Sequence, residues 1–76
     1  MSDYIETYHV DGRPVSFTIT EVHDDLYATA VDSDRLFLER VWKYMENEGW
    51  ALDEITQCGP AGWFISMWME SSGFII

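Results

Sequence analysis

The chain has 76 residues, of which 47% are hydrophobic and 16% aromatic, and its formal net charge at pH 7 is -10. This length predicts one domain over residues 1–76, and the hydrophobic content excludes a disordered acidic tail. The negative charge argues against direct binding to nucleic acid or to an anionic membrane surface, because both are polyanions.

The first half of the chain predicts three strands joined by short turns. Residues 3–10 show the period-2 pattern of a strand. One side carries Tyr4, Glu6, Tyr8 and Val10, and the other carries Ile5, Thr7 and His9. Asp-Gly within residues 11–14 is a hairpin signal, and residues 15–22 form the clearest alternating strand. Residues 23–25 read as a turn and residues 26–31 as a third strand. We expect these three strands to form an antiparallel meander.

A helix is predicted between Asp32 and Gly49. Asp32, Ser33 or Asp34 is expected to cap its N-terminus, and Gly49 is expected to end it in the left-handed conformation. At 100° per residue, five apolar side chains fall on one side: Phe37, Leu38, Val41, Trp42 and Met45. Leu36 is the exception, because it is apolar and lies on the charged side.

The remaining residues predict two further strands. Residues 50–57 read as a strand in which Asp53-Glu54 breaks the alternation, as expected at a sheet edge or a bulge. A Gly-Pro turn over residues 58–62 leads to the last strand, residues 63–70. The order β-β-β-α-β-β predicts an α+β fold, with an antiparallel sheet of four to five strands and one amphipathic helix packed on one face.

The segment MENEGWALDEIT, residues 45–56, carries a local resemblance. Its helix end, followed by Glu-Gly-Trp-x-Leu and a strand, resembles a signature of small uncharacterised bacterial and phage α+β domains. Those domains have no assigned chemistry, so the resemblance implies the fold class and no function.

The location in the cell is predicted from three features. The sequence holds no apolar run near the length of a membrane-spanning helix. The first ten residues lack a basic start followed by an apolar block, so no secretory signal is expected. The lone cysteine, Cys58, cannot form an internal disulfide, which favours a reducing, cytoplasmic setting.

No catalytic, metal or cofactor site is predicted. Cys58 with His9 or His23 is a conceivable nucleophile set, but Cys58 lies in a Gly-Pro turn and not at a helix N-terminus. Residues 23–25 offer metal ligands without a second cluster at metal-site spacing. Residues 32–35 imitate the start of a calcium loop but lack its required glycine, so helix capping explains them better.

The last strand is unusually rich in large apolar side chains. Trp63, Ile65, Met67 and Met69 share one face, and Phe64, Ser66, Trp68 and Glu70 share the other. One helix covers only one side of a sheet, so the other side is expected to expose Phe64 and Trp68, or Trp63 and Met67 if the faces are reversed. Four further apolar side chains are also expected to be exposed: Tyr4, Tyr8, Leu36 and Trp50. Packing of residues 73–76 over the second face is the competing explanation.

Charge is the second informative feature. Residues 35–48 contain three basic and three acidic residues, so the rest of the chain carries all of the -10. Eight carboxylates at expected strand ends and turns are candidate phosphate mimics: Asp11, Glu21, Asp24, Asp25, Asp32, Asp34, Asp53 and Glu54. An acidic surface is also common for solubility alone.

These features favour a partner over a substrate. The leading hypothesis is a small, acidic, non-enzymatic binding protein that docks on a basic, nucleic-acid-handling protein by charge mimicry and an aromatic patch. Phage anti-CRISPR, anti-restriction and nuclease-immunity proteins are of this kind. The alternative is a small homodimeric interaction domain that is acidic only for solubility. A salt-adapted domain is a third hypothesis, against which the abundance of Trp, Phe and Ile argues.

Overall fold

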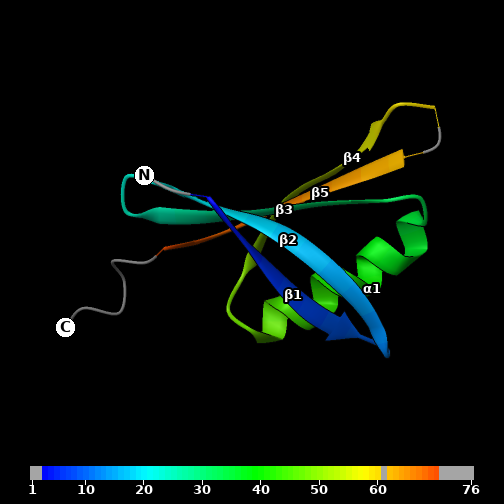
Figure 1. The fold of residues 1–76 in the computed structure, drawn as a ribbon, viewed down its shortest axis with the longest axis horizontal. Helices are drawn as coiled ribbons and strands as arrows, with labels where there is room; N and C mark the ends of the chain where they lie inside the picture. Colours follow the sequence, from blue (N-terminus) through cyan, green and yellow to red (C-terminus); the bar gives the residue numbers. More distant parts are fainter. Residues whose placement is uncertain (1–2, 61, 71–76) are drawn as a thin grey trace.

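The computed structural model describes residues 3–60 and 62–70. Within these residues the chain forms β1 (Tyr4–Val10), β2 (Arg13–Val22), β3 (Asp25–Asp32), α1 (Arg35–Asn47), β4 (Ala51–Cys58) and β5 (Gly62–Glu70). Every pair of neighbouring strands is antiparallel. The predicted α+β class, with a five-stranded antiparallel sheet and one helix, is therefore confirmed (Figure 1).

The spatial order of the strands is β1-β2-β3-β5-β4. The first three strands form the predicted meander. The chain then passes through α1 to the far edge of the sheet as β4, and returns as β5 between β4 and β3. The most aromatic strand is thus an interior strand, and β1 and β4 are the two edges. A helix that could cross a bilayer does not occur in the described part of the chain.

The two hairpin turns of the meander use left-handed backbone. Asp11 and Gly12 have φ of 54° and 78°, the pair of positive values that a two-residue type I′ hairpin turn requires. His23 has φ of 57° at the second turn. The prediction of a turn over residues 23–25 is wrong at its last residue, because Asp25 pairs with Val22 and begins β3.

Both ends of α1 are capped. The Asp34 carboxylate accepts hydrogen bonds from the backbone N–H groups of Leu36 and Phe37, which selects Asp34 from the three predicted caps. At the other end Gly49 has φ of 102°, and the Trp50 N–H donates to the Met45 carbonyl at 3.0 Å. This is a Schellman motif, in which the glycine stops the helix without strain.

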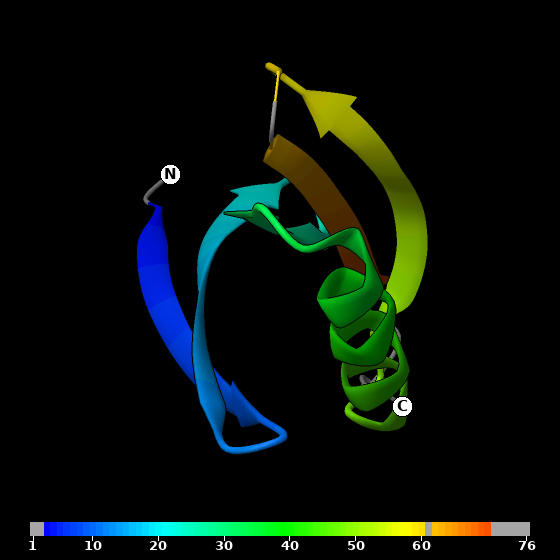
Figure 2. The ribbon, with the colours of Figure 1, turned by 90° about the vertical axis from the view of Figure 1, so that its right-hand side faces the viewer.

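The sheet coils around the helix, so that α1 lies on its concave side (Figure 2). The buried side chains come from α1 and from one face of the sheet: Val10, Val15, Phe17, Ile19, Ala28, Ala30, Phe37, Leu38, Val41, Met45, Trp50, Ile65 and Met67. Of the five predicted core residues of the helix, four are buried and Trp42 is half-buried. Leu36 is exposed on the outer side of the helix, as predicted.

The edge strand β4 contains the irregularity predicted at Asp53-Glu54. Leu52 pairs with Met67 and Glu54 pairs with Ser66, so Asp53 is the extra residue of a bulge. The bulge keeps Leu52 and Ile55 on the helix side and turns Glu54 to the other side. A charged bulge of this kind also discourages pairing of the edge with a further strand.

Candidate partner-binding surface

The two faces of β5 have opposite surroundings. Ile65 and Met67 are fully buried beneath α1, whereas Phe64 and Trp68 lie on the face turned away from the helix, which we call the open face. Trp68 retains 36% of its surface in solvent. The structure thus places Phe64 and Trp68, and not Trp63 and Met67, on the open face. Phe64 is half-buried there and not exposed as predicted, because β5 is an interior strand with a neighbour on each side.

Two cross-strand pairs build an apolar surface on the open face. Tyr27 on β3 lies directly opposite Trp68 on β5, and Val31 lies opposite Phe64. Directly opposed residues have Cβ atoms about 5 Å apart, so the two members of each pair are neighbours on this face. We call these four residues (Tyr27, Val31, Phe64 and Trp68) the outer patch. Between its two pairs, Thr29 lies opposite Ser66.

The other residues expected at the surface lie elsewhere. Trp50 was expected to be exposed and is only 6% exposed, because it packs into the core at the end of α1. Tyr8 is half-buried on the helix side, where its ring contacts those of Phe17 and Tyr44 edge to face. Tyr4 is exposed, but the register places it on the helix side with Ile19. The competing cover, residues 73–76, lies outside the described residues.

The Tyr8 hydroxyl lies beside a carboxylate of its own strand. It donates to Glu6 Oε1 at 3.1 Å. Burial, and then the hydrogen bond to the Glu6 carboxylate, raise the pKa of Tyr8 above its ordinary value, because both disfavour the phenolate. The ring of Tyr8 joins β1 to α1 through its contact with Tyr44, which is a structural role.

At least four of the eight candidate phosphate mimics interact with other groups of the chain: Asp11, Asp24, Asp32 and Asp34. Asp11 pairs with Arg40 at 3.2 Å and Asp32 pairs with Arg13 at 2.7 Å. Asp34 caps α1 through its Oδ1 atom. Asp11, Asp32 and Asp34 stabilise the fold, so their charge is partly compensated before any partner arrives.

Apart from Asp11, Asp32 and Asp34, the candidate carboxylates fall into two groups. Glu21, Asp24 and Asp25 lie at or beside the β2–β3 turn, and Asp53 and Glu54 lie on the edge strand β4. The register places Asp25 and Glu54 on the open face, beside the outer patch. The candidate acids therefore form two separate groups, one at the Trp68 end of this patch and one along its β4 side, and no single row of charges.

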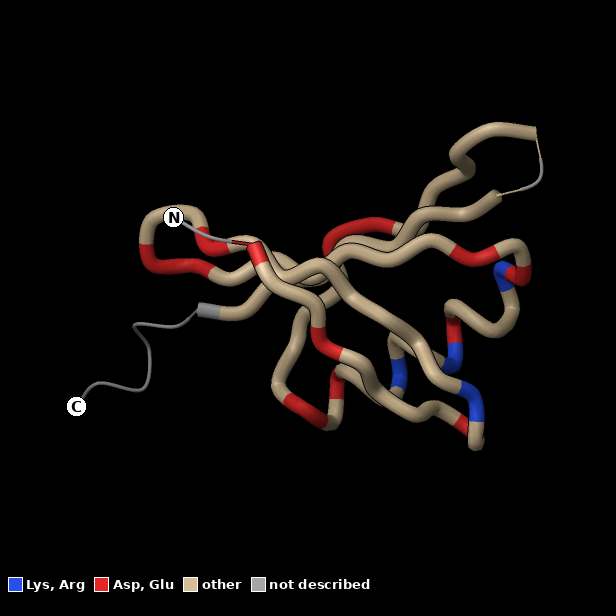
Figure 3. Tube along the Cα trace, in the orientation of Figure 1, with Lys and Arg blue, Asp and Glu red and all other residues tan. Residues whose placement is uncertain are grey.

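All four cations are gathered on the other side of the molecule. Arg35, Arg40 and Lys43 belong to α1, and Arg13 lies at the β1–β2 turn, as the blue segments in Figure 3 show. Three of them lie over aromatic rings as cation–π contacts: Arg13 over Phe37, Arg35 over Trp63, and Lys43 over Trp42. The open face has neither Lys nor Arg among its described residues.

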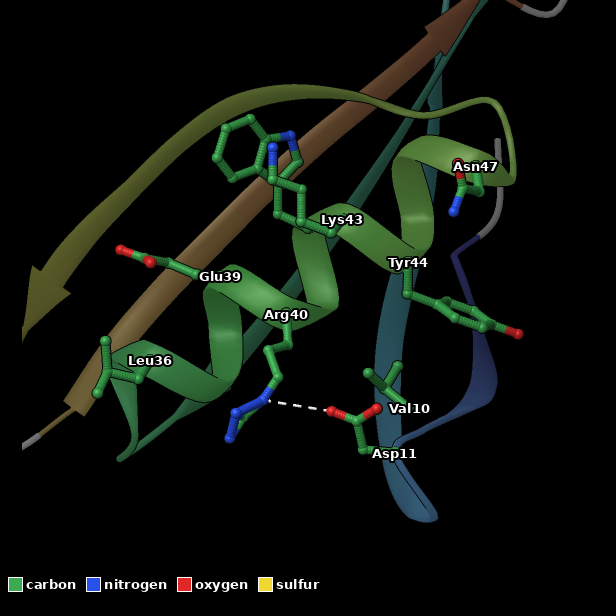
Figure 4. A pocket seen from close by; sticks show the side chains of 9 residues that line it. Val10, Asp11, Leu36, Glu39, Arg40, Lys43, Tyr44 and Asn47 are labelled. Carbon is green, nitrogen blue, oxygen red and sulfur yellow. Dashed lines mark ion pairs between the residues drawn. The ribbon is translucent and has the colours of Figure 1, made fainter.

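A shallow hollow of about 620 Å³ lies on the outer side of α1, next to the β1–β2 turn (Figure 4). Its polar lining includes Asp11, Arg40 and Lys43, and its apolar lining includes Leu36 and Trp42. Arg40 is engaged by Asp11, and Lys43 lies 4.3 Å from the Trp42 ring centroid. The hollow is therefore a mixed, largely self-compensated surface and offers no concentrated charge to a ligand.

The structure does not bring the conceivable nucleophile set together. His9 is on the edge strand β1, Cys58 is on the opposite edge strand β4, and His23 is in the turn at the other end of the sheet. Over residues 3–60 and 62–70, no three His, Cys, Asp or Glu side chains are grouped so that they could hold a metal ion.

Sequence reasoning missed Tyr27 and Val31 as members of the outer patch. The alternation in residues 26–31 does place both on one face of their strand. Their neighbours could not be known without the strand order, since β3 meets β5 only because β5 inserts between β3 and β4.

Comparison with known proteins supplies no relative. No protein-family model matches the chain. Searches of curated proteins and of solved structures find no significant match.

Proposed function

We propose that the chain is a small acidic binding protein that docks through its open face on a basic, nucleic-acid-handling protein. The observation that carries the proposal is the composition of that face. It combines the outer patch with the carboxylates of Asp25 and Glu54, while every cation of the chain lies at α1 or the β1–β2 turn. Such a surface repels anions and attracts a positively charged partner.

The apolar and the acidic parts of this surface have different tasks. Exposed aromatic side chains supply affinity at protein interfaces when a partner buries them. Carboxylates at the rim accelerate the encounter and take the place of phosphates that a basic partner would otherwise bind. A partner covered in this way loses access to nucleic acid, so binding amounts to inhibition. Anti-CRISPR, anti-restriction and nuclease-immunity proteins are the functional classes that fit.

The proposal is tested by competition with DNA. The chain is immobilised, and purified nucleic-acid-handling enzymes (a CRISPR effector, a restriction enzyme and a nuclease) are passed over it. We expect at least one to bind, to lose activity, and to be displaced by duplex DNA. Affinity should fall at least about tenfold between about 50 mM and about 500 mM salt, because the screening length shortens severalfold.

Two pairs of substitutions test whether binding depends on the acids beside the outer patch or only on the total negative charge. Asp53→Asn with Glu54→Gln removes two charges beside the outer patch, and Glu46→Gln with Glu48→Gln removes two charges at the end of α1. Only the first pair should weaken binding. Binding that is unchanged by salt, or weakened equally by both pairs, contradicts docking through the open face by charge mimicry.

A homodimer formed through the same face is the alternative function. Its support is that Trp68 and Phe64 are apolar groups that a second copy would also bury. Sedimentation equilibrium distinguishes the two: a dimer abolished by Trp68→Ala favours the homodimer, and a monomer that binds a basic enzyme favours the proposed inhibitor.

A further inference from the structure

Trp68 has a particular set of neighbours on the open face. Tyr27 lies directly opposite it on β3. Asp25, two residues earlier on β3, and Glu54 of β4, which pairs with Ser66, are two of its diagonal neighbours, and Ala51 of β4 lies directly opposite it. Diagonal neighbours in a sheet are about 7–8 Å apart, within reach of one long side chain. An aromatic pair is thus placed between two carboxylates on adjoining strands.

The chain itself shows which group such a combination holds. Arg13 lies 4.1 Å from the Phe37 ring centroid and pairs with Asp32 at 2.7 Å. Arg35 lies 5.3 Å from the Trp63 ring centroid and pairs with Glu39. In both cases a guanidinium lies over an aromatic ring and pairs with a carboxylate. This arrangement satisfies the flat face and the donors of arginine together.

The set around Trp68 contains the rings and the carboxylates without the cation. Within the described part of the chain, Asp25 and Glu54 make no hydrogen bond or ion pair, and no cation stacks on Tyr27 or Trp68. Every Arg and Lys of the sequence belongs to α1 or lies at the β1–β2 turn. A cation that binds here would therefore belong to another molecule.

We propose that Tyr27 and Trp68, flanked by Asp25 and Glu54, form a binding site for an arginine side chain of a protein partner. The inference rests on the proposed function and deepens it, because it names the residue type that the open face selects. Arginine is favoured over lysine, since its planar guanidinium can stack on Trp68 and still donate two parallel hydrogen bonds to a carboxylate. A lysine ammonium is a point charge and is more strongly hydrated.

The test uses two probes that differ only in this respect: a short arginine peptide and a lysine peptide of equal length and charge. Both are titrated into the full chain at low salt, and the four indole N–H signals are followed by NMR. We expect the arginine peptide to bind about threefold to tenfold more tightly. The indole signal that disappears in Trp68→Leu should shift most, ahead of those of Trp42, Trp50 and Trp63.

Three variants complete the design. Trp68→Leu and Tyr27→Leu should each reduce the arginine preference toward unity, while the weaker, salt-dependent attraction to both peptides remains. Leu36→Ala, which trims an exposed apolar residue on the outer side of α1, should leave the preference unchanged. Circular dichroism shows whether each variant is folded. If Trp68→Leu does not fold, Tyr27→Leu still tests the site.

Equal affinity for the two peptides, or an arginine preference that survives both Trp68→Leu and Tyr27→Leu, overturns the arginine site. Such a result would leave the proposed function standing if a basic enzyme is still displaced from the chain by DNA. If DNA does not displace any basic enzyme but the arginine preference is intact, the proposed inhibition is rejected and the arginine-binding site stands.

Discussion

The residues that begin α1 show how one acidic side chain can be read in two ways. Asp34 was both a predicted cap and a candidate phosphate mimic. Its Oδ1 atom accepts from the N–H groups of Leu36 at 3.0 Å and Phe37 at 3.2 Å. Asp32 accepts from the Asp34 N–H at 2.9 Å and from Arg13 at 2.7 Å. Both carboxylates therefore serve the fold first, because they satisfy donors that the helix cannot.

Replacement of the cap should destabilise the protein without affecting a partner-binding surface. We expect Asp34→Ala to lower the free energy of unfolding by about 1 kcal/mol, and Asp34→Ser to restore most of it, because serine also accepts from the first turn. Urea unfolding followed by circular dichroism measures both. Ser33→Ala, at the neighbouring exposed position, is the control and should change little. If it matches Asp34→Ala, the cap is not what stabilises this helix start.

At the scale of the element, β5 divides its side chains between two environments. Met67 is fully buried beneath α1 and Trp68, the next residue, points to the open face. Alternation along a strand is enough to place them on opposite faces. Which face the helix covers had to come from the structure, since the pattern alone allowed both.

Because the two faces of β5 differ in burial, we expect the loss of the smaller side chain, Met67, to destabilise the protein more than the loss of the larger one, Trp68. Met67→Ala should lower the free energy of unfolding by about 2–4 kcal/mol, because it opens a cavity in the core. Trp68→Ala removes more atoms, but should cost less than Met67→Ala because about a third of Trp68 is already in water and its loss leaves no enclosed cavity. Chemical denaturation of the two variants at the same protein concentration provides the comparison. A Trp68→Ala variant as unstable as Met67→Ala would mean that the open face is covered in solution, and would contradict its role as a free surface.

Local pattern predicted the elements well and their arrangement incompletely. The strands, the helix, its glycine stop and the irregularity at Asp53 all followed from alternation, helical periodicity and turn chemistry, which act between residues near in sequence. The position of β5 between β3 and β4 depends on pairing between residues more than thirty positions apart, such as Tyr27 with Trp68. No short-range rule specifies such a pair, so the outer patch could be predicted only in part.

At the scale of the whole molecule, charge is segregated. The sequence showed that residues 35–48 are neutral and that the remainder carries the net charge. The structure adds that three arginines pair with Asp11, Asp32 and Glu39, and that all the cations lie around α1 and the adjoining turn (Figure 3). Composition alone does not show which acids form ion pairs. Two of the pairs join residues that are distant in sequence, and the third joins residues one turn apart on α1.

This segregation predicts that salt stabilises the protein. The three ion pairs found among residues 3–60 and 62–70 have partly exposed side chains, and surface pairs of this kind each contribute less than about 1 kcal/mol. Mutual repulsion among carboxylates without a nearby cation opposes folding, because the compact state holds them closer together than the unfolded chain does. Raising sodium chloride from about 50 mM to about 500 mM screens both effects, and the repulsion is the larger.

The free energy of unfolding should therefore rise over this range, and thermal or urea unfolding at fixed pH 7 measures it. Asp53→Asn with Glu54→Gln should be more stable than the parent chain at low salt and should respond less to added salt, since two of the repelling charges are gone. If the free energy of unfolding instead falls with salt, the arginine ion pairs contribute more to stability than the carboxylate repulsion removes. In that case the acids beside the open face would not act as an uncompensated field, and long-range attraction of a basic partner would lose its physical basis.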